Sequence, residues 1–74
     1  MCILFLTLLP IVLGERTLLR CHTHVYSELH TSTVCPSLRG TMTSNGCHVM
    51  TNQVCQTRGF RRCRYAGSLY ATCT

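Results

Sequence analysis

The sequence predicts a small, disulfide-rich, mostly β domain that follows an N-terminal signal peptide. One observation is an uncharged, apolar segment at residues 1–14, with every acidic and basic residue beyond it. Another is that six of the seven cysteines lie after this segment. A third is that short segments of high β propensity alternate with turn signals, while no segment shows sustained helical periodicity. These observations divide the chain into a signal peptide at 1–14 and one domain at 15–74.

The apolar segment at 1–14 has the length of a secretory signal core, because it is shorter than the roughly 20 residues that span a membrane. Val12 and Gly14 are small residues suited to a cleavage site. Cleavage after Gly14 also removes Cys2, which leaves an even number of cysteines. We therefore expect a secreted, extracellular protein. The alternative is an uncleaved segment that anchors the chain at a membrane interface.

The domain at 15–74 is near the size at which a chain of about 60 residues is marginally stable without crosslinks. Tryptophan is absent and Phe60 is the only phenylalanine of the domain, so a large aromatic core is excluded. Three disulfides are therefore expected to stabilise the fold, with their pairing left open. The cysteines expected to form them are Cys21, Cys35, Cys47, Cys55, Cys63 and Cys73.

The first half of the domain contains two predicted strands. Residues 17–26 and 31–35 are rich in β-branched and apolar side chains, which favour extended structure. The second strand is expected to end at Cys35, because Pro36 follows it.

The second half contains a predicted hairpin and a closing strand. Residues 41–50 should form the hairpin, because Asn45-Gly46 at their centre tolerates the positive φ angles of a tight turn. Residues 66–68 are expected to be a turn, and residues 69–73 the closing strand.

The charge of the chain favours acidic partners. It has seven arginines, no lysine and a formal net charge of +5. Positive charge steers encounters with anionic surfaces. The expected partners are a cell-surface receptor, an anionic membrane or an anionic polysaccharide. We expect no nucleic-acid partner, and we expect a monomer.

The segment 58–65 concentrates charge and aromatic rings around one cysteine. Guanidinium groups bind carboxylates, phosphates and sulfates through paired hydrogen bonds, and rings beside them can enter a lipid interface. A disulfide at Cys63 would hold the segment rigid. The alternative interpretation is a solvated loop that only keeps the protein soluble. The candidate binding residues are Arg58, Phe60, Arg61, Arg62, Arg64 and Tyr65.

Histidines offer candidates for catalysis or metal binding, but suitable partners are few. Cys21-His22-Thr23-His24 contains donors that zinc prefers, yet it lacks a paired metal-binding spacing, and a secretory route would oxidise the thiol. Only Glu15 and Glu28 could orient a histidine base. No metal, no cofactor and no enzymatic activity are therefore expected.

Two segments resemble short-chain three-finger neurotoxins. Residues 20–35, with their spacing of Cys21 and Cys35, resemble the first loop of that family, and Arg39-Gly40-Thr41 followed by Gly46-Cys47 resembles the descending part of the second. The resemblance implies a degenerate three-finger-like fold, because the strand before Arg39 and the closing cysteine pattern of the family are missing. It also implies that Arg39 lies at a loop tip and contacts a receptor.

The leading hypothesis is a secreted, cationic, cysteine-rich binding peptide that acts as a toxin-like or receptor-modulating ligand. One alternative is a membrane-active host-defence peptide, in which arginines attract anionic lipid while Phe60 and Tyr65 insert. Further alternatives are a small membrane-associated protein that keeps residues 1–14, and a recently arisen reading frame without an evolved fold.

Overall fold

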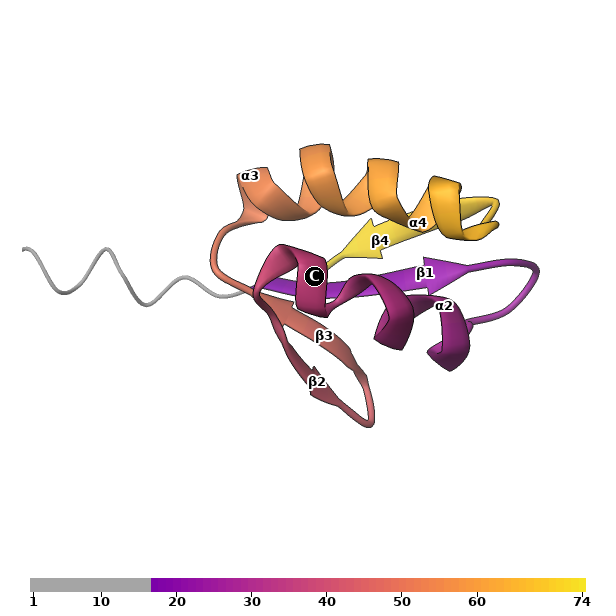
Figure 1. Ribbon diagram of the computed structural model, residues 1–74, viewed down its shortest axis with the longest axis horizontal. Coiled ribbons are helices and arrows are strands. Elements are labelled where there is room, and N and C mark those ends of the chain that lie inside the picture. Colours follow the sequence, from indigo (N-terminus) through magenta and orange to yellow (C-terminus); the bar gives the residue numbers. More distant parts are fainter. Residues whose placement is uncertain (1–16) are drawn as a thin grey trace, which may run out of the picture.

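A computed structural model describes residues 17–74, so the predicted signal peptide at 1–14 lies outside the described residues. A strand and a helix are followed by a hairpin, a longer helical segment and a closing strand (Figure 1). The domain is therefore mixed α/β, and the expectation of a mostly β domain missed its helices. The elements are β1 (Thr17–His22), α2 (Glu28–Val34), η1 (Pro36–Leu38), β2 (Thr41–Thr43), β3 (Gly46–Val49), α3 (Asn52–Val54), η2 (Cys55–Gly59), α4 (Phe60–Ala66) and β4 (Tyr70–Cys73).

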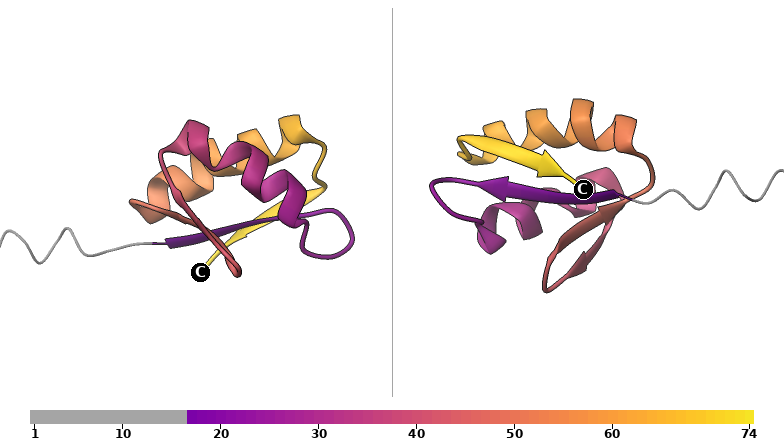
Figure 2. Two further views of the ribbon diagram at one scale, coloured as in Figure 1. Left: turned by 60° about the horizontal axis from the view of Figure 1, so that its bottom comes forward. Right: turned by 180° about the vertical axis from the view of Figure 1, so that it is seen from behind.

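The four strands form one antiparallel sheet with the order β2-β3-β1-β4. The register places Leu19 of β1 between Cys47 of β3 and Cys73 of β4. Side chains alternate along β1, and those of Thr17, Leu19 and Cys21 are buried. Both helical segments lie on the face of the sheet to which these side chains point (Figure 2). Among residues 17–74, no helix lies on the opposite face, which we call the uncovered face of the sheet.

Three disulfides tie both helical segments to the sheet. Two of them join the segment from α3 to α4 to the central strand and to the closing strand, and the third joins the end of α2 to β3. The prediction that six cysteines form three disulfides is confirmed. The bonds are Cys21–Cys63, Cys35–Cys47 and Cys55–Cys73, with Cα–Cα distances of 5.4, 5.7 and 6.1 Å.

The apolar core between sheet and helices is small. Within residues 17–74, the buried aliphatic side chains are those of Leu19, Val34, Leu38 and Val49. The other buried members of this core are cysteines, so the disulfides occupy much of the space that a larger domain fills with aliphatic groups. Crosslinks and packing therefore stabilise the same region.

The predicted strand at residues 31–35 is wrong, because α2 occupies this segment. Ser27 caps the helix, with its side-chain oxygen accepting a hydrogen bond of 3.2 Å from the backbone N–H of His30. The hydroxyl of Thr31 donates to the Ser27 carbonyl at 2.8 Å, a bond that suits threonine to a helix. Thr31 and Val34 face the sheet from this helix. Local capping and burial thus override the β propensity of the threonines.

A second helical segment runs without a break from Asn52 to Ala66. Thr51 caps its start by accepting a hydrogen bond from the Val54 N–H, and Gly67 ends it with a φ of 110°. Its buried positions recur about one turn apart: Cys55, Gly59 and Cys63. The expectation that no segment is helical is therefore wrong here too, since cysteine and glycine form the buried face.

The predictions for the remaining strands hold. The hairpin predicted at 41–50 is present as β2 and β3, and the closing strand predicted at 69–73 is present as β4. The turn predicted at 66–68 is present at the end of α4. The strand predicted at 17–26 is shorter, because β1 ends at His22 and the chain bends before α2.

Residues 20–35, which resemble the first neurotoxin loop, form the end of β1, a bend and α2. They do not form a two-stranded finger. Within the described part of the chain, no helix is long and apolar enough to cross a membrane.

Candidate functional site

Two disulfides fix the helical segment that carries most of the arginines. Cys55 in η2 is bonded to Cys73, and Cys63 in α4 is bonded to Cys21. All four cysteines lie on the side of the helix that faces the sheet or within the sheet itself. The outward side of the helix is therefore presented by a rigid support.

Three arginines and one tyrosine share this outward side. Arg58, Arg61, Arg62 and Tyr65 are spaced at i, i+3, i+4 and i+7, which places them along one face of a helix. All four are exposed, whereas Cys63 between them is fully buried. We call these four residues the arginine stripe. The structure thus brings together four of the seven predicted binding residues.

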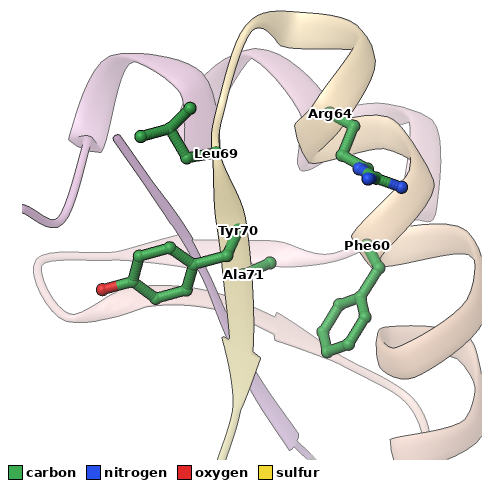
Figure 3. Close-up of a pocket in the computed structure, with 5 residues that line it drawn as sticks. All are labelled: Phe60, Arg64, Leu69, Tyr70 and Ala71. Atoms are coloured by element: carbon green, nitrogen blue, oxygen red, sulfur yellow. The ribbon is translucent and has the colours of Figure 1, made fainter. Parts of the chain in front are cut away.

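Phe60 and Arg64 lie on a different side of α4, toward β4. With Leu69, Tyr70 and Ala71 they line an open pocket of about 230 Å³. Figure 3 shows Phe60 and Arg64 on adjacent turns, Ala71 pointing toward the helix and Tyr70 pointing away from it. The pocket is smaller than the roughly 300 to 1,000 Å³ of typical small-molecule sites, and Arg64 provides its only charged group.

A second depression lies between α2 and α4. It is lined by Thr33, Val34 and Ser37 on one side and by Arg62, Tyr65 and Ala66 on the other. One edge of the arginine stripe therefore borders a groove between the two helical segments.

Arg39 belongs to another element. It directly follows η1, is exposed, and has a left-handed backbone with φ 56° and ψ 38°. Arg39 is therefore not part of the arginine stripe, which lies on η2 and α4.

The charged side chains of the described residues are almost all positive. Residues 17–74 contain six arginines, and Glu28 is their only acidic side chain. Glu28 lies in the first turn of α2, on a different element from the arginine stripe. Acidic side chains are thus too few to neutralise the stripe, which leaves it a cationic surface.

The uncovered face of the sheet carries a cluster of side chains that was not predicted from the sequence. The ring of His22 stacks on that of Tyr70, and the Arg20 guanidinium lies 4.3 Å from the centre of the Tyr26 ring. His22 Nε2 is also 3.3 Å from the Thr72 hydroxyl. The signal in the sequence was alternation, because Arg20 and His22 share one face of β1, as Tyr70 and Thr72 share one face of β4.

Burial lowers the pKa of His22 below its ordinary value, and the positive charge of Arg20 lowers it further. His22 is therefore more readily neutral than a histidine in solvent. In residues 17–74, no group of three or more histidine, cysteine or acidic residues is arranged to hold a metal ion. The six cysteines of the domain are all in disulfides.

No family model, curated protein or solved structure matches this chain. The function must therefore be inferred from the geometry and charge of the domain.

Proposed function

We propose that this protein is a secreted, cationic binding protein whose arginine stripe recognises an acidic surface on a cell-surface receptor. The observation that carries the proposal is that three exposed arginines, Arg58, Arg61 and Arg62, lie within five residues of one helical segment, beside the buried Gly59 and Cys63. Such a surface offers many N–H donors to carboxylates or sulfates.

The support of the stripe favours binding. The helix is held by disulfides at Cys55 and Cys63, so little backbone order has to be created when a partner binds. Arg61 and Arg62 lie in the first turn of α4, and Arg58 lies just before them in η2. A compact cluster of carboxylates on a partner could contact all three arginines at once.

An extracellular setting fits the covalent structure. Three disulfides in a domain of this size are typical of oxidising compartments. The apolar segment at 1–14 supports a secretory route.

If the protein acts like a three-finger toxin, its main receptor contact lies outside the arginine stripe. The neurotoxin resemblance assigns receptor contact to Arg39, which follows η1 and does not belong to the stripe. Variants of the two surfaces therefore distinguish a toxin-like contact from a contact made by α4.

The proposal is tested with the secreted, disulfide-bonded protein on cells that bind it. The double variant R61Q/R62Q should bind at least about tenfold more weakly, because each charge-assisted hydrogen bond contributes about 1.5 to 3 kcal/mol. The matched control is R39Q, which removes an exposed arginine of another element and should bind like the wild type. Circular dichroism and the absence of free thiols establish that both variants are folded.

Enzymatic removal of sulfated polysaccharides from the cells, and separate trypsin treatment, identify the partner. Saturable binding that survives the first treatment and is lost after the second supports a protein receptor. Unchanged binding of R61Q/R62Q, or loss of binding in R39Q alone, would overturn the assignment of the stripe. Loss of binding after polysaccharide removal would replace the receptor with a sulfated polysaccharide.

A further inference from the structure

The exposed apolar side chains of the described residues gather at one end of the molecule. Six large hydrophobic residues are 49% to 79% exposed, and five of them belong to the connection from β1 to α2, the first turn of α2, or the region where α4 leads into β4. Both connections lie at the same end in Figure 1. The sixth, Met50, follows β3, whose register places it at the opposite end of β1. We call the five residues the apolar tip: Val25, Leu29, Tyr65, Leu69 and Tyr70.

Hydrogen bonds hold the two connections of the apolar tip together. The backbone N–H of Leu69 donates to the carbonyl of His22 at 2.8 Å. His30 Nδ1, in the first turns of α2, lies 2.9 Å from the Ser68 hydroxyl. The two connections that carry the tip are therefore held together at one end of the domain, although they come from segments far apart in the sequence.

Two arginines border the apolar tip. Arg64 lines the same pocket as Leu69 and Tyr70, and Arg62 lines the same depression as Tyr65. The only acidic side chain of residues 17–74, Glu28, also lies at this end, next to Leu29. The tip thus combines exposed apolar side chains with a net positive border.

We propose that the apolar tip inserts into the interfacial layer of an anionic lipid bilayer, with Arg62 and Arg64 contacting lipid phosphates. Tyrosine rings favour the boundary between water and hydrocarbon, and leucine and valine side chains gain from leaving water. Anionic lipids attract each arginine near the surface. This mode of attachment needs no membrane-spanning helix.

Charge favours a bilayer over a second copy of the chain. Two tips facing each other would bring their arginines together, and juxtaposed like charges oppose association. An anionic bilayer supplies both an apolar layer for the tip and negative groups for its border. The tip and its border share Tyr65 and Arg62 with the arginine stripe, whereas Val25, Leu29, Leu69, Tyr70 and Arg64 lie outside it, so variants of Leu69 and Arg64 test insertion apart from the receptor contact.

Insertion is tested with a tryptophan reporter, because the natural chain has no tryptophan. The variant L69W places the reporter in the tip, and M50W places it at an exposed position at the opposite end. With vesicles of phosphatidylcholine and phosphatidylserine, the emission of L69W should shift to shorter wavelength, while that of M50W should not. Vesicles of phosphatidylcholine alone should give a smaller shift.

Vesicle co-sedimentation measures the contributions of the two kinds of side chain. L69S should bind about tenfold more weakly, from the lost transfer of one leucine, whereas the control M50S should bind like the wild type. R64Q should bind anionic vesicles about fivefold more weakly. E28Q should bind them more tightly, since it removes the only acidic side chain of residues 17–74, which lies next to Leu29 of the tip.

Several outcomes would overturn the proposal. One is an unshifted L69W emission on anionic vesicles, and another is an equal shift for L69W and M50W. Wild-type vesicle binding by L69S would mean that charge alone attracts the protein. Concentration-dependent dimerisation abolished by L69S would assign the tip to a second copy. Arg64 lies outside the arginine stripe. The predicted loss of vesicle binding in R64Q and the predicted loss of cell binding in R61Q/R62Q can therefore be refuted independently.

Discussion

His22 of β1 and Tyr70 of β4 stack their rings on the uncovered face of the sheet, with centroids 4.6 Å apart and planes inclined by 7°. Tyr26 approaches His22 edge-on, with 6.1 Å between ring centres. The Thr72 hydroxyl lies beside Nε2 of His22. Burial is the larger cause that lowers the pKa of His22, and the positive charge of Arg20 is the smaller cause. This packing favours the neutral imidazole and links the stability of the domain to pH.

The free energy of unfolding should decrease as the pH falls below neutrality. Because folding lowers the pKa of His22 below its ordinary value of 6.5, the unfolded chain takes up the proton first. Stability is therefore fully present above pH 6.5 and is lost as the pH falls through the folded-state pKa. Urea unfolding of the disulfide-bonded protein between neutral and mildly acidic pH measures this slope.

H22Q should remove this part of the pH dependence, while H24Q, which alters an exposed histidine of the adjacent bend, should keep it. R20Q should reduce the slope only in part, since burial is the larger cause of the pKa shift. An equal slope in the wild type and H22Q would refute the assignment.

Thr31 should tolerate serine better than valine. Its side chain is fully buried, and its hydroxyl accepts a hydrogen bond of 2.9 Å from the Cys21 N–H while donating to the Ser27 carbonyl. T31V leaves both backbone groups without this partner and should destabilise the domain by about 2 kcal/mol. T31S keeps the hydroxyl and should cost about 1 kcal/mol through the lost methyl group. Urea unfolding gives both values, and a T31V protein as stable as the wild type would contradict the prediction.

Thr31 also illustrates why the sequence predicted some elements and missed others. The hairpin could be predicted because Asn45-Gly46 is a local signal. The helix α2 was missed because its threonines favour strands locally, whereas the bond from Thr31 to the backbone of Cys21 depends on tertiary packing. The buried positions from α2 through η1 are Thr31, Val34, Cys35 and Leu38, which follow helical spacing. Threonine and cysteine occupy half of these positions, so the sequence shows no apolar periodicity there.

The candidate site could be predicted as a segment but not as a surface. Composition singled out residues 58–65, because arginines and rings are concentrated there. Only the helical phase shows that Arg61 faces outward while Arg64 turns toward β4. The apolar tip could not be predicted, since Leu29 and Leu69 come together through the fold.

Gly40 should not tolerate a larger side chain. A Cβ at this position would clash with Cys47 Sγ and would lie 2.8 Å from the carbonyl oxygen of His48 and 3.0 Å from Cys35 Sγ. Neither the disulfide nor the strand backbone can move freely, so G40A should destabilise the domain by about 1 to 3 kcal/mol. Thermal unfolding of G40A measures the effect, with S44A in the exposed hairpin turn as control. Equal midpoints for G40A and the wild type would show that this close packing is absent.

The three disulfides should differ in their contribution to stability, because they close loops of different length. Cys21–Cys63 spans 42 residues, whereas Cys55–Cys73 and Cys35–Cys47 span 18 and 12. The loss of chain entropy in the unfolded state predicts a contribution of about 4 kcal/mol for the longest loop and about 3 kcal/mol for each of the others. Paired replacement by alanine, followed by urea unfolding, tests the order, and C21A/C63A should be the least stable variant. C21A/C63A should also free α4 from β1. If the arginine stripe needs this rigid support to bind the receptor, adding R61Q/R62Q to C21A/C63A should weaken receptor binding no further. A C21A/C63A variant more stable than C35A/C47A would show that native packing, rather than loop length, decides the contribution of each bond.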